Sequence, residues 1–181
     1  AQALLDQHNL KGFVCFHLGA NWEPKRWPAA HFAKLADGIF NQWRLPIVLT
    51  GSHSDSSLAE FMIRETHQAR VISLVGRTSL GELAAIFKQA QIVVSGDSGP
   101  MHVASGVGAR LIALFGPTDP DLTGPRGLGE TVILQHVPSG YTVPWYGKKF
   151  PGEGWLSQIQ PEEVLEAIEN KNWLKPPRTT P

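Results

Sequence analysis

The sequence predicts an α/β domain built on a doubly wound, parallel sheet of the Rossmann-like kind. Short, β-rich apolar runs alternate with segments of helical period along most of the chain. The strand segments are nearly unbroken apolar runs, as expected of parallel strands covered on both faces. With 181 residues, 42% of them hydrophobic and 18% charged, the chain has enough material for one globular domain with its own core.

The expected elements follow one another with few interruptions, and the predicted domain spans residues 1–181. A helix tail over residues 1–10 begins abruptly, which suggests a piece of a longer protein. Strands are expected at 13–17, 46–50, 71–75, 91–95 and 109–115, with a weaker sixth candidate at 131–134. Helices are expected at 30–43, 54–67, 79–89, 100–107 and 161–170.

Local signals support the boundaries of these elements. Ser79 and Glu82 have the spacing of a capping box at the start of one helix. Pro161 suits the first position of the last helix, and glutamates follow it in the first turn. Residues 117–129 are interpreted as a loop, and residues 171–181 as a tail whose proline-rich end is expected to fray.

The charge balance limits the classes of partner. Sixteen basic residues balance sixteen acidic ones, so a general affinity for nucleic acid is not expected, and any anion site must be built locally. No run of about 18 apolar residues predicts a membrane span, and no signal peptide is visible. A cytoplasmic location is therefore compatible with the sequence.

Metal and cofactor chemistry finds little support in the sequence. Cys15, the single cysteine, lies in an apolar run and is interpreted as a buried core residue, which excludes a disulfide framework and a cysteine zinc site. His8, His31, His67 and His136 show no metal-ligand spacing. We therefore expect neither a metal nor a cofactor.

Two unusual loops follow the first and fourth expected strands. If the strand order is the common 3-2-1-4-5-6, these strands are neighbours at the point where the order reverses, which is where such sheets bind ligands. The loops are residues 17–28 (HLGANWEPKRWP) and residues 96–102 (GDSGPMH). Their meeting predicts a ligand site, and the prediction depends on that strand order.

The second of these loops has the composition of an anion site. Gly99 permits a tight turn, and Pro100 suits the first helical position. Backbone N–H groups then point outward at a helix N-terminus and can bind a diphosphate; they belong to Ser98, Gly99, Met101 and His102. The alternative is an ordinary strand–turn–helix connection in which Asp97 only caps the helix.

The first loop supplies a cation. Lys25 can reach over the strand ends as a point charge for phosphate, although a solvated basic pair with Arg26 is the alternative. Trp27 is interpreted as a packing residue beneath the loop. Residues 116–118 are either part of the rim of the site or a plain tight turn.

Three motifs in sequence order strengthen this interpretation: GANWEPKRWP, SGDSGPMHVAS and LFGPTDPDLTGP. Together they resemble those of glycosyltransferase family 9, the ADP-heptose:lipopolysaccharide heptosyltransferases, and the resemblance covers residues 13–127 well. It implies a GT-B fold of two Rossmann-like domains with a cleft between them. The chain is similar to the C-terminal, donor-binding domain of that fold.

The resemblance also implies roles for individual residues. It places Lys25 on the donor diphosphate, and it assigns the phosphate and heptose portions to Asp97, Ser98, Gly99 and His102. It brings the segment of Arg77 and Thr78 near the adenine, and Asp55 is the nearest match to a glutamate that binds the ribose. The family often has a polar pair in the loop before the lysine, where this sequence departs from the pattern with Ala20 and Asn21.

By the same resemblance, the expected chemistry is an inverting, metal-independent transfer of heptose from ADP-heptose to a lipopolysaccharide precursor. The carboxylate base belongs to the missing N-terminal, acceptor-binding domain, while Lys25 stabilises the ADP leaving group. The chain alone is expected to bind a nucleotide sugar without completing the transfer. The full-length protein is expected in the cytoplasm, with peripheral contact to the inner membrane as one option.

Two other functions stay open at this point. Half of a GT-B-like sugar-nucleotide epimerase would share the phosphate site but not the KRWP and FGPTDP pair. A non-catalytic nucleotide-sugar-binding module would keep the fold and lack the chemistry. The sequence does not determine the base or sugar of the donor, or the acceptor.

Overall fold

The computed structural model describes residues 2–10, 12–20, 22–137 and 154–175. Within them, one six-stranded sheet has the order β3-β2-β1-β4-β5-β6, and all its neighbouring strands are parallel. The strands are β1 Val14–His17, β2 Ile47–Thr50, β3 Val71–Ser73, β4 Ile92–Gly96, β5 Leu111–Phe115 and β6 Thr131–Gln135. The predicted strand order and fold class are confirmed.

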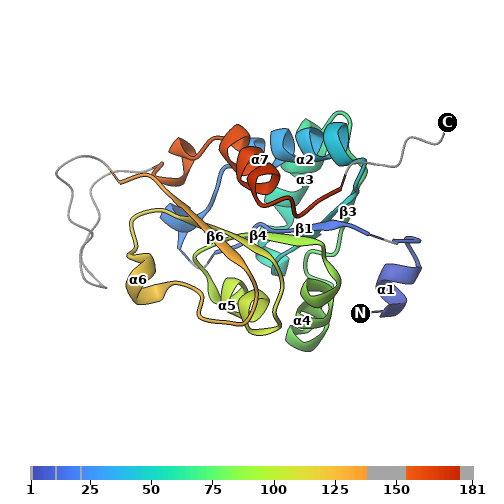
Figure 1. Ribbon diagram of the computed structural model, residues 1–181. Helices are drawn as coiled ribbons and strands as arrows, with labels where there is room; N and C mark the ends of the chain where they lie inside the picture. The colour runs from blue at the N-terminus through green and yellow to red at the C-terminus, as the bar shows by residue number, and fades with distance from the viewer. Residues whose placement is uncertain (1, 11, 21, 138–153, 176–181) are drawn as a thin grey trace.

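Helices cover both faces of the sheet (Figure 1). On one face lie α2 Ala29–Trp43, α3 Ser56–Glu65 and α7 Pro161–Asn170. On the other face lie α4 Leu80–Gln89 and α5 Gly99–Gly106. Two short helices remain, namely α1 Gln2–Asp6, whose Leu5 is buried in the core on the α4 and α5 side, and α6 Pro120–Thr123.

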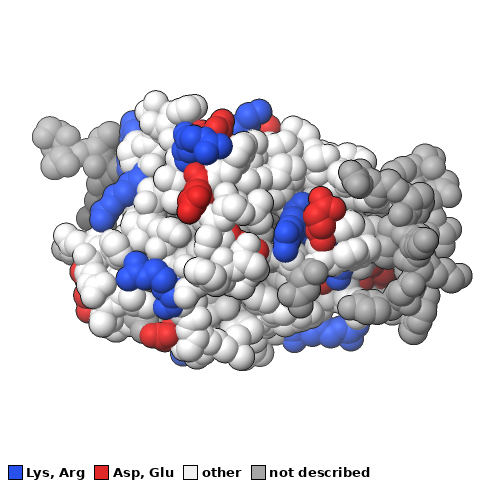
Figure 2. All heavy atoms as spheres, turned by 180° about the vertical axis from the view of Figure 1, so that it is seen from behind, with Lys and Arg blue, Asp and Glu red and all other residues white. Residues whose placement is uncertain are grey.

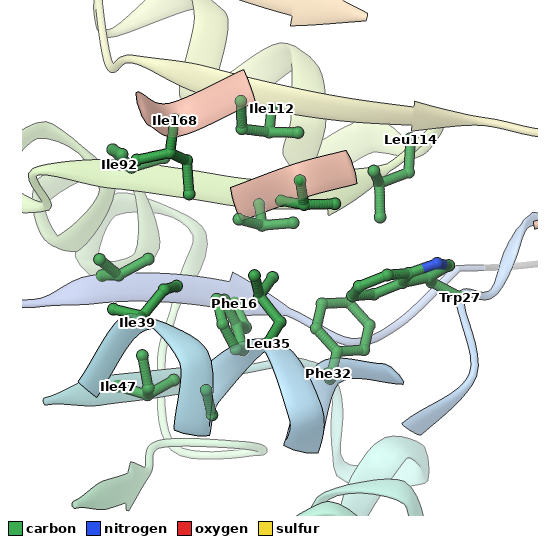
Figure 3. Close-up of a cluster of buried hydrophobic side chains, with 14 of the residues drawn as sticks. Phe16, Trp27, Phe32, Leu35, Ile39, Ile47, Ile92, Ile112, Leu114 and Ile168 are labelled. Carbon is green, nitrogen blue, oxygen red and sulfur yellow. The ribbon is translucent and has the colours of Figure 1, made fainter. Parts of the chain in front are cut away.

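Alternation along the strands divides the core between the two faces. In β1, Val14 and Phe16 point toward α2 and α7, and Cys15 points toward α4 and α5. The first set meets Leu35 and Ile168, which are fully buried (Figure 3). Because both faces bury apolar side chains, the strands are apolar throughout, and this is the pattern that the sequence displays.

The start of α4 agrees with the local sequence signals, whereas α5 begins one residue earlier than predicted. Ser79 and Glu82 form the predicted capping box, with 2.9 Å between Ser79 N and Glu82 Oε2. By contrast, α5 begins at Gly99, so Pro100 occupies its second position and not the predicted first. Ser98, not Asp97, is the N-cap, in extended conformation, and the Asp97 side chain pairs with Lys25.

Two segments interpreted as irregular contain more structure than expected. The predicted loop 117–129 includes α6, because Asp119 caps it with 2.8 Å between Asp121 N and Asp119 Oδ1 and Pro120 suits its first turn. The predicted tail, residues 171–181, includes Trp173 and Leu174, which are buried in the core. Residues 176–181 lie outside the described part of the chain.

Among the described residues that Figure 2 shows, on the side opposite to Figure 1, charges of one sign form no large patch. Figure 2 shows basic and acidic side chains interspersed among neutral ones on that side. An anion site on such a chain has to be built from particular groups rather than from net charge. Across the described ranges, no helix has both the length and the apolar character needed to span a bilayer.

Candidate functional site

The loops after β1 and β4 converge at the carboxyl edge of the sheet. The two strands are direct neighbours, with His17 in register with Ser95. After β1 the chain forms a short 3-10 turn, η1 Glu23–Lys25. Gly96 makes its close approach possible, because a Cβ added there would lie 2.6 Å from the carbonyl oxygen of Lys25.

Lys25 and Asp97 form an ion pair at this point. Lys25 Nζ lies 2.5 Å from Asp97 Oδ2, and the two side chains are 13% and 5% exposed. Thr118 Oγ1 donates to the same carboxylate oxygen at 2.6 Å, and Thr123 Oγ1 does so at 3.5 Å. We call these four residues the Lys25–Asp97 cluster. It places a cation, a buried carboxylate and two hydroxyl groups at the predicted switch point of the sheet.

The start of α5 borders this cluster. No hydrogen-bond partner is found among the described residues for the backbone N–H groups of Ser98 and Gly99. The prediction that the Met101 amide is free to bind an anion is wrong, because this amide donates to the Ser98 carbonyl at 3.1 Å. The Ser98 hydroxyl turns back to the Gly96 carbonyl at 3.2 Å. His102 is exposed on the first turn of α5.

The neighbours of Lys25 lie as the sequence predicts. Arg26 points back to its own loop, where Nε donates to the Ala20 carbonyl at 2.9 Å. Trp27 is 3% exposed and packs edge-on against Phe32, while its Nε1 donates to the Ile159 carbonyl at 3.0 Å. It is a packing residue, and Lys25 is therefore the cation of this loop that faces Asp97.

A second polar cluster lies on the other side of β1. His17 Nδ1 is 3.1 Å from Thr50 Oγ1, both at the ends of their strands. Asp55 Oδ2 accepts from Ser52 N at 2.7 Å and from Ser52 Oγ at 2.6 Å. We call these four residues the His17–Asp55 cluster. Gly19 accommodates it, since a Cβ added there would lie 2.4 Å from Asp55 Oδ2.

Burial sets the protonation of two side chains in this region. It lowers the pKa of His17 from 6.5 to about 4, and the nearby Asp55 carboxylate opposes that shift only in part. Burial also raises the pKa of Cys15 to about 12, against the effect of its hydrogen bond to Thr50. His17 is therefore neutral at neutral pH, and Cys15 is an unreactive core thiol, as predicted.

The remaining predicted site residues lie toward β2 and β3. The loops after these strands are joined by Gly76 N, which donates to the Gly51 carbonyl at 3.0 Å. Thr78 is half-buried in this region, and Asp55 is buried. Asn21 lies outside the described residues. The structure thus brings Lys25, Asp97, Ser98, Gly99 and His102 to the β1–β4 side, and Asp55 and Thr78 to the β2–β3 side.

The sequence interpretation missed several members of these clusters. Thr118 stands in the segment 116–118 that the sequence places either on the rim of the site or in a plain turn, but its contact with Asp97 is not predicted, and Thr123 and His17 have no predicted role. Gln135, at the end of β6, donates through Nε2 to the carbonyls of Gly116 and Thr118 at 2.8 Å each. Nothing in its local sequence signals this contact. Over the ranges described, no group of three or more His, Cys, Asp or Glu side chains is placed to hold a metal ion.

Comparison with known proteins identifies relatives over most of the chain. Residues 1–143 match glycosyltransferase family 9 (heptosyltransferase). Lipooligosaccharide heptosyltransferase 2 of Haemophilus influenzae is 37% identical over 170 residues, which cover 92% of this chain and 48% of that protein. Lipopolysaccharide heptosyltransferase 2 of Salmonella typhimurium is 32% identical over 164 residues, covering 86% of this chain and 45% of the relative.

Solved structures show the same relation. The structure of Escherichia coli ADP-heptose lipopolysaccharide heptosyltransferase II superposes with a TM-score of 0.77 at 28% identity, over 93% of this chain and 50% of that one. A family 9 glycosyltransferase from Veillonella parvula superposes with a TM-score of 0.76 at 26% identity, over 94% of this chain and 49% of that one. The chain spans about half the length of these relatives. On this likeness in sequence and fold, the chain belongs to glycosyltransferase family 9, the heptosyltransferase family.

Proposed function

We propose that this chain is the C-terminal, donor-binding half of an inverting, metal-independent GT-B heptosyltransferase. In this proposal it binds the diphosphate of ADP-heptose between Lys25 and the start of α5. The observation that carries the proposal is the Lys25–Asp97 ion pair, 2.5 Å long, beside that helix N-terminus at the switch point of the sheet.

The groups at this point suit a diphosphate. Backbone N–H groups at a helix N-terminus bind anions, and the helix dipole favours negative charge there. The amides of Ser98 and Gly99 are available for this role. Asp97 holds the Lys25 ammonium in place, and a bound diphosphate would then share the ammonium with this carboxylate. His102, exposed on the first turn of α5, is proposed to contact the phosphate or a heptose hydroxyl.

The nucleoside is proposed to lie toward β2 and β3. Thr78 borders the adenine in this arrangement, and Asp55 and Asn21 stay predictions as further donor-binding residues. The identity of the base rests on the relatives, since the E. coli structure is by name that of an ADP-heptose heptosyltransferase. The other half of the protein, outside this chain, is proposed to bind a lipopolysaccharide precursor as acceptor.

The proposed transfer gives this half a defined part in the chemistry. The acceptor hydroxyl attacks the anomeric carbon as the bond from that carbon to the ADP oxygen breaks, and its proton goes to a carboxylate of the other half. Negative charge then builds on the leaving diphosphate. Lys25 and the α5 N-terminus are placed to stabilise that charge in the transition state.

Thermal denaturation of the chain with and without nucleotides tests the proposal. ADP and ADP-heptose are expected to raise the melting temperature, and a ligand at 100 times its Kd adds about 2.7 kcal/mol of stability. Lys25→Ala is expected to abolish the shift. Lys34→Ala, which removes an exposed lysine of α2, is the matched control and should keep it.

The outcomes separate the parts of the proposal. If no nucleotide shifts the melting curve, donor binding by this chain is wrong. If UDP-sugars produce the shift and ADP compounds do not, the heptose donor is wrong while nucleotide-sugar binding stands. Transfer of heptose by the chain alone would contradict the proposal that the catalytic carboxylate base belongs to the other half of the protein.

A further inference from the structure

The β5–α6 loop reaches into the Lys25–Asp97 cluster through one buried hydroxyl. Thr118 is 6% exposed, and its Oγ1 donates to Asp97 Oδ2 at 2.6 Å. A threonine hydroxyl has a single proton to donate, and Asp97 takes it. Thr118 therefore acts on the site through the carboxylate and has no proton left to offer a phosphate directly.

Gln135 holds this loop in place from the neighbouring strand. It is the last residue of β6 and pairs in register with Phe115, the last residue of β5. Its side-chain amide has two N–H donors, and Nε2 contacts the carbonyls of Gly116 and Thr118 at 2.8 Å each. Both contacts hold the turn that contains Thr118. The position of the threonine hydroxyl therefore depends on β6, although β6 contributes no residue to the ion pair.

The shared oxygen gives Thr118 a specific effect on Lys25. Asp97 Oδ2 accepts from Lys25 Nζ at 2.5 Å and from Thr118 Oγ1 at 2.6 Å. The single proton of Thr123 Oγ1 has the Asp119 carbonyl at 3.1 Å as a nearer acceptor than Asp97 Oδ2 at 3.5 Å. A carboxylate oxygen accepts about two strong hydrogen bonds. With Thr118 in place, the charge of this oxygen is divided between the hydroxyl and the ammonium. Without this hydroxyl, the charge of the oxygen would act on Lys25 undivided, and the carboxylate would compete harder with an incoming phosphate.

We propose that Thr118, held by Gln135, is a positioning residue that fixes the Asp97 carboxylate and so keeps the Lys25 ammonium available to a diphosphate. The inference rests on the proposed function and extends it to Thr118, in the candidate rim 116–118, and to Gln135, which the sequence did not single out. It describes a line of contacts from β6 through the β5–α6 loop and the end of β4 to the loop after β1. Every link in this line joins groups that are buried or half-buried.

Two substitutions at one position test the role of the hydroxyl. Thr118→Val keeps the shape of the side chain and removes the hydroxyl, whereas Thr118→Ser keeps the hydroxyl. ADP affinity measured by calorimetry is expected to fall about tenfold in Thr118→Val, as for loss of a hydrogen bond to a charged group, and to stay within about twofold in Thr118→Ser. Thr131→Val is the matched control, since its hydroxyl makes only a 3.5 Å contact with the Gly129 carbonyl.

Affinities are compared at a temperature at which circular dichroism shows each variant folded, so that lost stability is not mistaken for lost binding. Wild-type affinity in Thr118→Val overturns the inference, and so does equal weakening in Thr118→Ser, which would assign the effect to shape. A wild-type chain that does not bind ADP overturns both this inference and the proposed function. The positioning role is supported if Thr118→Ser and Thr131→Val both keep the wild-type ADP affinity while Thr118→Val loses it.

Discussion

The Lys25–Asp97 cluster and the His17–Asp55 cluster lie on opposite sides of β1 at the same edge of the sheet, and they handle burial differently. The first brings a cation and a carboxylate together with hydroxyl donors beside a helix N-terminus. The second keeps a neutral imidazole beside Thr50 and a carboxylate that caps its own turn. The first cluster holds the charges that the proposed diphosphate would contact, whereas the Asp55 carboxylate of the second caps its own turn.

This difference allows the proposed binding role and a folding role to be tested separately at one sheet edge. Polar groups at the carboxyl ends of parallel strands are ligand candidates by position alone. Asp55 already accepts two hydrogen bonds from Ser52 through Oδ2, and its role toward a donor stays a prediction. The charged partners and the adjacent amides distinguish the Lys25–Asp97 cluster, and substitutions in the two clusters should therefore have different signatures.

The largest expected effect is on the ion pair. Asp97→Ala leaves the poorly exposed Lys25 ammonium without its carboxylate, which should lower the free energy of unfolding by about 3–5 kcal/mol. Asp55→Ala removes a cap and no ion pair, and should lower it by about 1–2 kcal/mol. Urea denaturation followed by circular dichroism measures both. Equal losses would break the contrast between the clusters.

A pH dependence of stability should arise from the His17–Asp55 cluster. The native pKa of His17 is about 4, below the 6.5 of an ordinary histidine. Between pH 6.5 and pH 4, His17 is therefore protonated in the unfolded chain but not in the native chain. The free energy of unfolding falls by up to about 3 kcal/mol as the pH drops through this range. Above pH 6.5 this contribution is constant.

Urea denaturation at about pH 7 and about pH 4.5 measures this loss. His17→Gln should be less stable than the wild type at the higher pH and should lose less stability on acidification. His67→Gln, at an exposed histidine, is the control and should keep the wild-type slope. A wild-type slope in His17→Gln would show that other groups cause the acid loss.

The smallest expected effect concerns the cap of the 3-10 turn η2 His53–Asp55. Ser52→Ala removes the hydroxyl that donates to Asp55 at 2.6 Å and should lower the free energy of unfolding by about 1 kcal/mol. ADP affinity should be unchanged if the cluster serves folding alone. A clear loss of ADP affinity in this variant would instead join Asp55 to the donor site, as the family resemblance implies.

Sequence reasoning could predict the centre of the candidate site for a definite reason. Lys25 and Asp97 are 72 residues apart, but each follows a strand, and the rule for doubly wound sheets places those strand ends together. The details at the start of α5 could not be predicted. The local signals leave the start of α5 open by one residue, whereas in the structure Pro100 is second in the helix and the Met101 amide donates to the Ser98 carbonyl.

The sequence by itself determined the alternation of strands and helices, the family, and the two loops that meet at the switch point, because periodicity, capping and turn residues act within a few positions of one another. Only the tertiary structure decided that Thr118 completes the ion pair, that Gln135 holds its loop, and that His17 is buried as a neutral imidazole. Those properties depend on which side chains packing brings within hydrogen-bond reach and excludes from water. The residues next to Thr118 and His17 in the sequence therefore do not reveal which group the threonine hydroxyl contacts or how far the pKa of the histidine shifts.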